Sequence, residues 1–581
     1  MATLRSKSIQ SKTLFFATSP RTPFKIIPEI ALLDEELRGE IWNPETQIRF
    51  YNLLRERDFF EGDEAKDKAF AARDRINRVP KGLGFITLPI VGLSDAGREF
   101  LESDNKEEIL LRQLLKFQIP SPYHPLGNKA ADFNVKPYLE LFRLIRDLDG
   151  LRFDELHIFG MQLINYERYD EIVAKIRKFR KDKEAYKGSY KEFKDRVLTA
   201  EVSEMFWEEI AAQNFHTRES RTSNKAQFIA KKARNLRDYA DAAVRNLRST
   251  GLVKATSIGR TLSIMPERRK DVDYFLSTID RKPAFVNDIV AYQKNLWNPA
   301  VPVLLTDNRD SIVTKLQEEF GVTADSSLSL NKLKDLLREH IEKRKEKKVA
   351  DEVKVLKEYT LYADIENTFE TMENTYEPSL FFEWNTWRAM TMLDGGSIRA
   401  NLKFDDEGKP MNTAAGKMAD IVCDYGDFDV IVEVSRSSGA LQFKMEGEPV
   451  PRHIGINVEQ TGKPTYCFFI APTINPATVA HFYTLYVSNV TMYGGKCKII
   501  PLTLKTFRKM LKMAVDAEIK PRPANIKQLF DESTKYVKEC MLADGTEVDW
   551  YNKITETASN WLDEPSPYYG SIAAEPQTPY L

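Results

Sequence analysis

The sequence predicts a multidomain α+β protein in which a mostly helical N-terminal module is followed by a C-terminal α/β domain. Its 581 residues suggest about three or four domains at roughly 150 residues each. Between about residues 30 and 280 the apolar residues recur mainly at helical spacing, whereas long buried-type strands appear in the last third, at TYCFFIAP (465–472) and KCKIIPL (496–502).

The composition excludes several classes of protein. Lys and Arg number 85 against 86 Asp and Glu, and 42% of residues are hydrophobic, so neither a disordered nor a fibrous chain fits. The four cysteines never occur as CxxC, which excludes a zinc knuckle and a disulfide framework and favours reduced thiols. Because no signal peptide and no run of 18 apolar residues is found, we expect a soluble, cytoplasmic protein.

Charge differs between the two halves of the chain. Residues 1–280 contain 49 Lys/Arg and 43 Asp/Glu, which leaves 36 and 43 for residues 281–581. This difference suggests a polyanionic partner for the first half and cation-binding carboxylates in the second. Solvated helix faces could produce a difference of the same size.

The helical region is interrupted twice by the same arrangement of a helix, a glycine turn, two short β runs and another helix. The first copy spans 75–101, with Ser94 as the predicted N-cap of its second helix, and the second spans 242–276. Both resemble the hairpin of a winged helix-turn-helix, although ordinary α+β domains also contain this order. We therefore expect two winged-helix-like subdomains, at 1–135 and 136–278.

The most basic stretch of the chain lies before the second hairpin. Residues 218–254 contain ten Lys/Arg and three Asp/Glu, an excess that fits the phosphates of a polyanion better than a solvated helix. A second basic helix, 168–196, carries eleven basic and six acidic residues, and for it we favour a solvated face. The proline-containing segment 279–306 is predicted to be a linker, and 563–581 a flexible tail.

A hairpin in the last third brings two acids together. The apolar runs IVC and VIVEV flank residues 425–428, and Gly426 occupies the first central position that a type II′ hairpin requires. A turn centred between Gly426 and Asp427 places Asp420 opposite Glu433, with Cβ atoms about 5 Å apart on one face. Like charges repel, so the pair makes chemical sense around Mg²⁺, which binds converging oxygen ligands. A one-residue register shift would separate the acids onto opposite faces.

Two more carboxylates can join this pair. After Glu433 the loop SRSSG leads into a helix, ALQFKMEGEP, that carries Glu446 about one turn in, pointing back at the strand end. In the preceding helix PSLFFEWNTWRAMTML, Glu383 lies next to the apolar face that contains Leu380 and Trp387. Glu383 could instead lie at the edge of that face and reach water.

A helix, a hairpin with Asp and Glu, a helix with another acid and then buried strands form the order of the PD-(D/E)xK nuclease fold. Seven segments also carry a family likeness: ATSPRTPFKIIPEI (17–30), ARDRINRVPKGLGF (72–85), RNLRDYADAAVRNLRSTGL (234–252), FEWNTW (382–387), AAGKMAD (414–420), EVSRSSGALQFKMEGEPVPRH (433–453) and IAPTINPAT (470–478). Through them the sequence resembles the AlwI, MlyI and BstNBI group of type IIS restriction and nicking endonucleases, which share their architecture with FokI. The FKMEGEPVPRH block is specific to this group.

The resemblance implies a prokaryotic intracellular, Mg²⁺-dependent, site-specific deoxyribonuclease. Its N-terminal module would read a short asymmetric DNA site, and a cleavage domain at 307–562, with a helical lead-in, would cut a few base pairs outside that site to leave 5′-phosphate ends. Some members act with a second copy of themselves or with a small nuclease subunit. The alternative is a winged-helix specificity subunit whose cleavage domain is inactive.

The family's catalytic acids correspond to Glu383, Asp420, Glu433 and Glu446. By the same resemblance, one or two Mg²⁺ ions would be held by Asp420, Glu433, Glu383 and the backbone carbonyl of Val434. Ser435 stands where the E-x-K motif has lysine, so the general base is unassigned among Glu446, Lys444 and a water activated by the metal. The residues expected to contact DNA are Arg21, Arg73, Arg75, Arg78, Lys81, Arg218, Arg221, Lys225, Lys231, Lys232 and Arg234.

Overall fold

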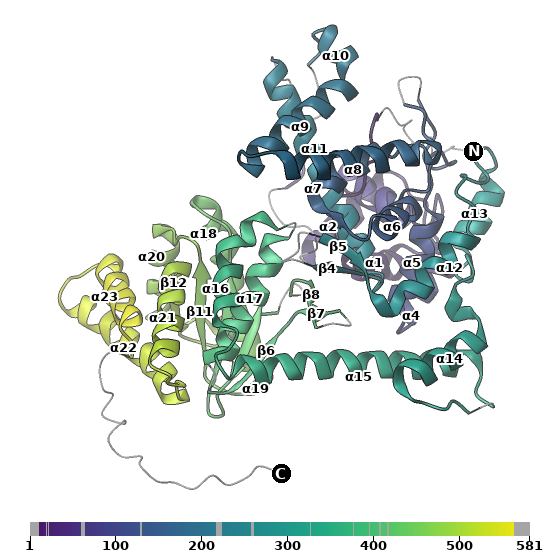
Figure 1. Cartoon of the computed structure of the whole chain (residues 1–581). Coiled ribbons are helices and arrows are strands. Elements are labelled where there is room, and N and C mark those ends of the chain that lie inside the picture. Colours follow the sequence, from purple (N-terminus) through teal and green to yellow (C-terminus); the bar gives the residue numbers. More distant parts are fainter. Residues whose placement is uncertain are drawn as a thin grey trace. The chain divides into compact units, whose positions relative to one another are not determined.

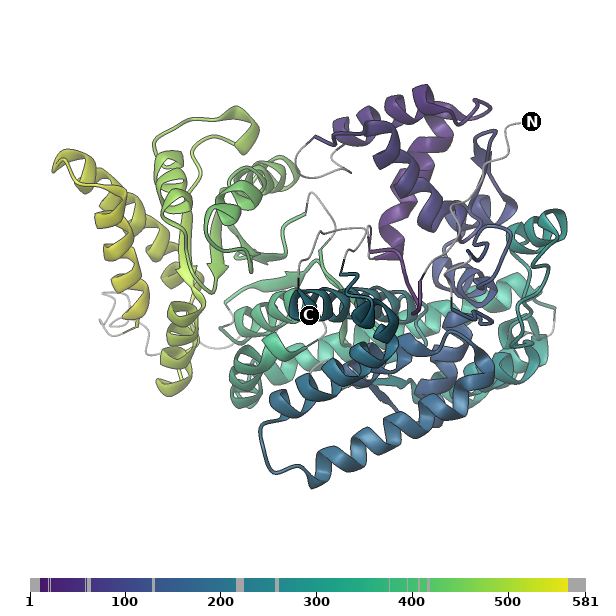
Figure 2. The same cartoon turned by 90° about the horizontal axis from the view of Figure 1, so that it is seen from above.

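The computed structural model confirms a multidomain α+β architecture (Figures 1 and 2). It describes residues 11–18, 20, 22–57, 59, 64–127, 131–215, 224–256, 261–325, 327–375, 377–393, 395–405, 408–414 and 418–562. The chain divides into two compact units, Met1–Glu342 and Lys343–Leu581, which we call the first and second units. The predicted tail at 563–581 lies outside the described residues.

The first unit is mostly helical, as predicted. Its helices are α1 (Ile27–Leu37), α2 (Pro44–Glu56), α3 (Lys68–Ile76), α4 (Asp95–Glu102), α5 (Lys106–Lys116), α6 (Pro137–Asp147), α7 (Phe153–Ile158), α8 (Tyr169–Ala185), α9 (Tyr190–Met205), α10 (Trp207–Ala211), α11 (Lys225–Arg248), α12 (Arg269–Thr278), α13 (Ile289–Trp297) and α14 (Arg309–Phe320). Its strands are β1 (Ile86–Thr87), β2 (Gly92–Leu93), β3 (Leu151–Arg152), β4 (Val253–Thr256) and β5 (Thr261–Ile264).

Both predicted helix–hairpin–helix arrangements are present. In the first, β1 and β2 pair antiparallel between α3 and α4, and the Ser94 hydroxyl accepts the Gly97 N–H as the predicted N-cap. In the second, α11 leads into the antiparallel pair β4–β5, which β3 extends to a sheet of order β3-β5-β4. The identification of these units as winged helices remains a prediction.

The segment predicted as a linker, 279–306, packs within the first unit. Leu296 of α13 is fully buried beside Tyr123 and Tyr292. The ammonium group of Lys116, on α5, donates to the backbone carbonyls of Asn295, Leu296 and Asn298 at 3.3, 2.9 and 2.7 Å. Because its free carbonyls are satisfied by a buried side chain, this segment is an ordered part of the first unit.

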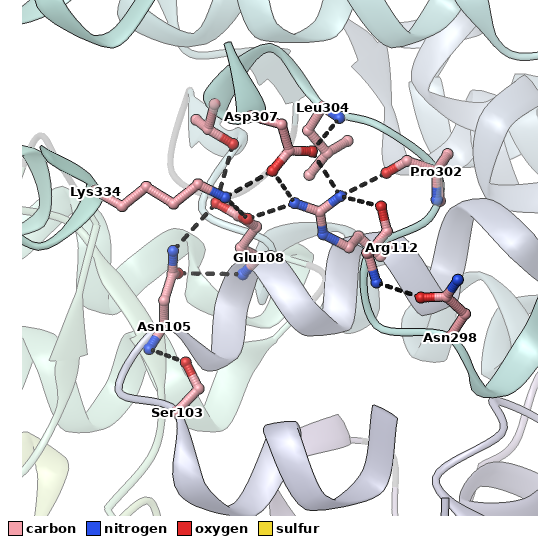
Figure 3. Close-up of polar contacts among 11 residues, drawn as sticks. Ser103, Asn105, Glu108, Arg112, Asn298, Pro302, Leu304, Asp307 and Lys334 are labelled. Carbon is pink, nitrogen blue, oxygen red and sulfur yellow. Dashed lines mark hydrogen bonds and ion pairs between the residues drawn. The ribbon is translucent and has the colours of Figure 1, made fainter. Parts of the chain in front are cut away.

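Helix α15 (Leu330–Leu356) carries the chain from the first unit into the second, so the boundary between the two units lies within a helix; the domain bounds predicted from the sequence remain a prediction. Its N-terminal part is held by a network of ion pairs on α5 (Figure 3). Lys334 Nζ contacts Glu108 at 2.9 Å and Asp307 at 2.7 Å, and Arg112 donates to both carboxylates at 2.6–2.9 Å. These donors hold the pKa of Asp307 at about 2, against the effect of burial, so the network stays ionised.

The second unit is built on a five-stranded mixed sheet of order β12-β11-β10-β9-β6. Its strands are β6 (Ser397–Ala400), β9 (Ile421–Asp424), β10 (Asp429–Val434), β11 (Thr465–Ala471) and β12 (Ile499–Thr503), and a separate hairpin comprises β7 (Lys403–Phe404) and β8 (Pro410–Asn412). The helices are α16 (Tyr362–Thr371), α17 (Pro378–Leu393), α18 (Ala440–Glu446), α19 (Pro449–Thr461), α20 (Pro476–Leu485), α21 (Leu504–Asp516), α22 (Pro523–Leu542) and α23 (Glu547–Ser559).

The sheet of the second unit is parallel from β10 to β12 and antiparallel from β10 to β6. One face packs on α19 and α20, where Ile431, Cys467 and Phe469 meet Ile454 and Phe482. Helices α22 and α23 contact the β12 edge, as Figure 1 shows. The apolar core therefore fixes which side chains of β10 face α19.

The four cysteines are buried and free, in agreement with the expectation of reduced thiols. Within the described part of the chain, no helix is long and apolar enough to cross a membrane.

Candidate active site

The β9–β10 hairpin has the register that its turn predicts. Asp429 pairs with Asp424 and Val432 pairs with Ile421, so the strands meet across a two-residue loop. Gly426 has φ +89°, the left-handed conformation that a type II′ turn needs at this position. The turn therefore sets which residue of β9 lies opposite which residue of β10.

The same register places Asp420 and Glu433 on one face. Val422 and Ile431 are cross-strand partners, and both pack against the core under α19 and α20. Side chains alternate along a strand, so residues two positions away from this pair point to the same side. Asp420 precedes β9 and its carboxylate accepts the backbone N–H of Val434 at 2.8 Å.

The pKa values of Asp420 and Glu433 are both raised. Burial is the largest cause for both, and it raises their pKa well above the ordinary value because it disfavours the ionised form. The charge of Glu433 adds to the effect on Asp420, and the charges of Glu446 and Glu383 add to the effect on Glu433. Each of the four predicted acids thus lies within electrostatic range of at least one other: Glu433 and Glu446 act on Asp420, and Glu446 and Glu383 act on Glu433.

The carboxylates of Glu383 and Glu446 each accept a hydrogen bond from an uncharged group of the protein. Glu383, on α17 and 7% exposed, accepts the N–H of Ala414 at 3.2 Å. Glu446, at the end of α18, accepts the hydroxyl of Ser435 at 2.6 Å. In the part of the chain that the structure describes, no three His, Cys, Asp or Glu side chains already converge on a common point as metal ligands. The carboxylate oxygens nevertheless suit a hard divalent cation. The charge of such an ion would offset the repulsion between the carboxylates and let them converge on it.

Ser435 takes the place of the missing lysine and has a different role. Its hydroxyl is buried and links Glu446 to the end of β10. The side-chain amide of Gln442, also buried, donates to the carbonyls of Ser437 and Thr473 at 3.0 and 2.8 Å. This bonding fixes the loop after β10 and orients α18, so Glu446 points at the strand end. Lys444 is exposed on α18.

His453 is the residue that the sequence did not single out. Its Nδ1 lies 2.8 Å from the carboxylate of Glu433, in the first turns of α19. Burial lowers the pKa of His453 to about 4, so the imidazole is neutral at physiological pH. Its Nε2 is buried and has no hydrogen-bond partner among the described residues. The one signal in the sequence was its place at the end of the FKMEGEPVPRH block.

The basic residues expected around the first hairpin are engaged to different degrees. Arg75 forms an ion pair with the buried Glu29, with Nε 2.7 Å from the carboxylate. Lys81 is buried, which lowers its pKa, and its ammonium lies 4.6 Å from the centre of the Tyr123 ring. These two residues therefore stabilise the first unit, since their charged groups are directed inward.

The other members of this group remain closer to the surface. Arg78 is exposed and pairs with Asp74 at 2.8 Å, while Arg73 is half-buried with its guanidinium 5.5 Å from the Phe70 ring centre. Arg21 lies outside the described residues.

The basic residues expected to contact DNA on and before α11 also differ in exposure. Lys225 and Arg234 are exposed, whereas Lys231 and Lys232 are half-buried and Lys232 Nζ lies 4.5 Å from the centre of the Phe206 ring. Arg218 and Arg221 lie outside the described residues.

The family profile of the AlwI restriction endonuclease matches residues 82–510, which include both hairpins and all four acids. This chain belongs to the AlwI restriction endonuclease family. No curated protein matches the chain. Among solved structures, the small subunit of the heterodimeric restriction endonuclease R.BspD6I is 25% identical, covering 35% of this chain and 96% of its own, with a TM-score of 0.27. The BpuJ1 endonuclease binding domain, solved with pyrene- and phenanthrene-modified DNA, is 12% identical, covering 49% and 96%, with a TM-score of 0.33.

Membership of the AlwI family makes the chain a restriction-type DNA endonuclease. The four acids lie inside the matched range.

Proposed function

We propose that this AlwI-family chain is a type IIS endonuclease that binds a short asymmetric DNA site through its first unit and hydrolyses a phosphodiester bond a few base pairs outside it. The observation that carries the proposal is the juxtaposition of Asp420 and Glu433 on one sheet face, where burial and neighbouring carboxylates raise the pKa of both acids. A protein keeps two buried like charges together at a cost in stability, which cation binding and catalysis explain.

In this proposal one or two Mg²⁺ ions would be held by Asp420, Glu433 and the Val434 carbonyl, with Glu383 completing the site. When bound, Mg²⁺ would lower the pKa of the attacking water and stabilise the negative charge on the leaving 3′ oxygen. The fit rests on the donors themselves, which are carboxylate and carbonyl oxygens.

The remaining roles belong to side chains of the protein. Glu446 is half-buried and oriented by Ser435, and it accepts the proton of the attacking water. His453 shares a proton with Glu433: when the carboxylate is ionised, Nδ1–H donates to it and fixes its direction. His453 is therefore a positioning residue. The products carry a 5′-phosphate and a 3′-hydroxyl.

One set of acids cuts one strand. Asp420, Glu433, Glu446 and Glu383 form one such set, so we propose that cleavage of both strands requires a second copy of the chain or a small nuclease subunit. A supercoiled plasmid distinguishes these cases, because one cut converts it to the open circle and two opposed cuts convert it to the linear form.

The test uses plasmid DNA, Mg²⁺ and three variants. Asp420→Asn and Glu433→Gln should abolish cleavage while binding DNA as the wild type does, and run-off sequencing of the wild-type digest should place the cut at a fixed offset from one recurring sequence. Asp424→Asn is the matched control, since Asp424 ends β9, four residues after Asp420, and pairs with Lys463 at 2.7 Å.

Two results would contradict the proposal. Cleavage retained by Asp420→Asn and Glu433→Gln would remove the acids from the chemistry. Wild-type protein that binds DNA and never cleaves it, alone or with a partner chain, would favour a specificity subunit with an inactive cleavage domain, a role that the absence of the E-x-K lysine at Ser435 also allows.

A further inference from the structure

The N-terminal half of α11 exposes one continuous stripe of side chains. Gln227, Ala230, Arg234 and Arg237 are all exposed, and they follow one another at intervals of three, four and three residues. At 100° per residue these positions lie within about 80° of one another around the helix axis. Ala226 is exposed at the edge of the same stripe.

The opposite side of this helix is buried. Phe228 and Leu236 are 1% and 2% exposed, and Phe228 packs against Phe206, which follows α9. The ammonium of Lys232 lies over the rings of Phe206 and Phe228, at 4.5 and 5.4 Å from their centres. The basic residues of α11 are therefore split between an inner side, with Lys232, and an outer side, with Arg234 and Arg237.

The outer stripe is cationic, and its acidic neighbours are Asp238, half-buried at its edge, and Asp241, buried at its C-terminal end. Neither Arg234 nor Arg237 forms an ion pair or side-chain hydrogen bond with a residue that the structure describes. Asp238 lies one turn beyond Arg234, and Asp241 lies one turn beyond Arg237 with its carboxylate bound by Arg245 at 3.0 Å. Two guanidinium groups thus project from a helix face on which the other exposed side chains are an amide and small methyl groups.

We propose that this stripe of α11 reads the bases of double-stranded DNA in the major groove. The groove admits one α-helix, a glutamine amide forms two hydrogen bonds with adenine, and an arginine guanidinium forms two with guanine. Ala226 and Ala230 let the helix backbone approach the base edges. The inference rests on the proposed function and adds to it the side of the helix that confers specificity, with Gln227 and Arg237 as specificity residues.

The experiment selects bound duplexes from a random double-stranded pool in EDTA, so it does not depend on cleavage. Affinity is then measured for the selected duplex and for a shuffled duplex of equal length. Gln227→Ala, Arg237→Ala and Ala230→Leu are compared with Arg177→Ala and Ala174→Leu, which alter exposed residues of α8. Leucine suits an exposed helix position, so Ala230→Leu changes the shape of the stripe without disturbing folding.

Each stripe variant should lose roughly ten- to a hundredfold in affinity for the selected duplex. Gln227→Ala and Ala230→Leu should leave affinity for the shuffled duplex unchanged, and both α8 variants should behave as the wild type. An unchanged ratio of selected to shuffled affinity in Gln227→Ala and Ala230→Leu would overturn the inference, as would equal losses on both duplexes in Arg237→Ala. A wild type that selects no sequence at all would instead overturn the proposed function.

Discussion

Removing one of the two clustered acids should stabilise the metal-free protein. With Asp420 and Glu433 opposite each other, their Cβ atoms are about 5 Å apart, and two full charges at that distance in an effective dielectric of about 20 repel by about 3 kcal/mol. Partial protonation of the wild-type pair reduces this value, so Asp420→Asn should gain about 2 kcal/mol at pH 8 in EDTA. For a unit of this size, that is a rise in Tm of about 4–8 °C. The asparagine keeps an acceptor for the Val434 N–H.

The sign of the pH dependence follows from the pKa shifts. Folding raises the pKa of both Asp420 and Glu433, so the folded state binds protons more tightly than the unfolded state. Wild-type stability therefore falls as pH rises from about 4 through the raised folded pKa, and the loss persists above it. The gain from Asp420→Asn should be small near pH 4.5 and complete at high pH.

Differential scanning calorimetry at pH 4.5 and pH 8 measures this effect, with Asp424→Asn as the control. Lys463 lowers the pKa of Asp424, so this control should show an unchanged or slightly lower Tm. Added Mg²⁺ should raise the Tm of the wild type and have no effect on Asp420→Asn. A Tm for Asp420→Asn that is lower than that of the wild type at pH 8, or a gain of equal size at both pH values, would refute the reasoning.

Three further outcomes are expected. Ser435→Ala should slow cleavage roughly ten- to a hundredfold with DNA affinity unchanged, because Glu446 loses its hydroxyl partner, and Ser435→Thr should restore most of the rate in single-turnover assays. His453→Ala should reduce the single-turnover rate and His453→Asn should recover part of it, since an amide nitrogen can replace Nδ1; equal rates in both variants would exclude the positioning role. Arg75→Ala should lower the free energy of unfolding by about 3–5 kcal/mol in urea, because Glu29 is left buried without its partner, and a variant that unfolds normally but binds DNA weakly would contradict this assignment.

The sequence predicted the hairpin because its determinants are local. A glycine at the first central position of a two-residue loop fixes the register, and the register alone sets Asp420 opposite Glu433. The contact of His453 with Glu433 spans 20 residues and two elements, and it depends on how α19 packs on the sheet. Periodicity contains no signal for that packing.

The structure adds most to the sequence at charged residues that the fold buries. Arg75 and Lys81 belong to a basic segment, and only the fold shows that Glu29 and Tyr123 hold their charged groups inside. The prolines of 279–306 are typical of a linker, but Lys116 binds the backbone of that segment from more than 170 residues away. Such long-range contacts cannot be derived from composition.

The location of a bound divalent ion tests the central claim most directly. Crystals grown with Mn²⁺ and measured at its absorption edge should show an anomalous peak between the carboxylates of Asp420 and Glu433, and the peak should be lost in Asp420→Asn. A peak elsewhere in the protein, or none at millimolar Mn²⁺ with the two carboxylates on opposite faces of the sheet, would contradict the account.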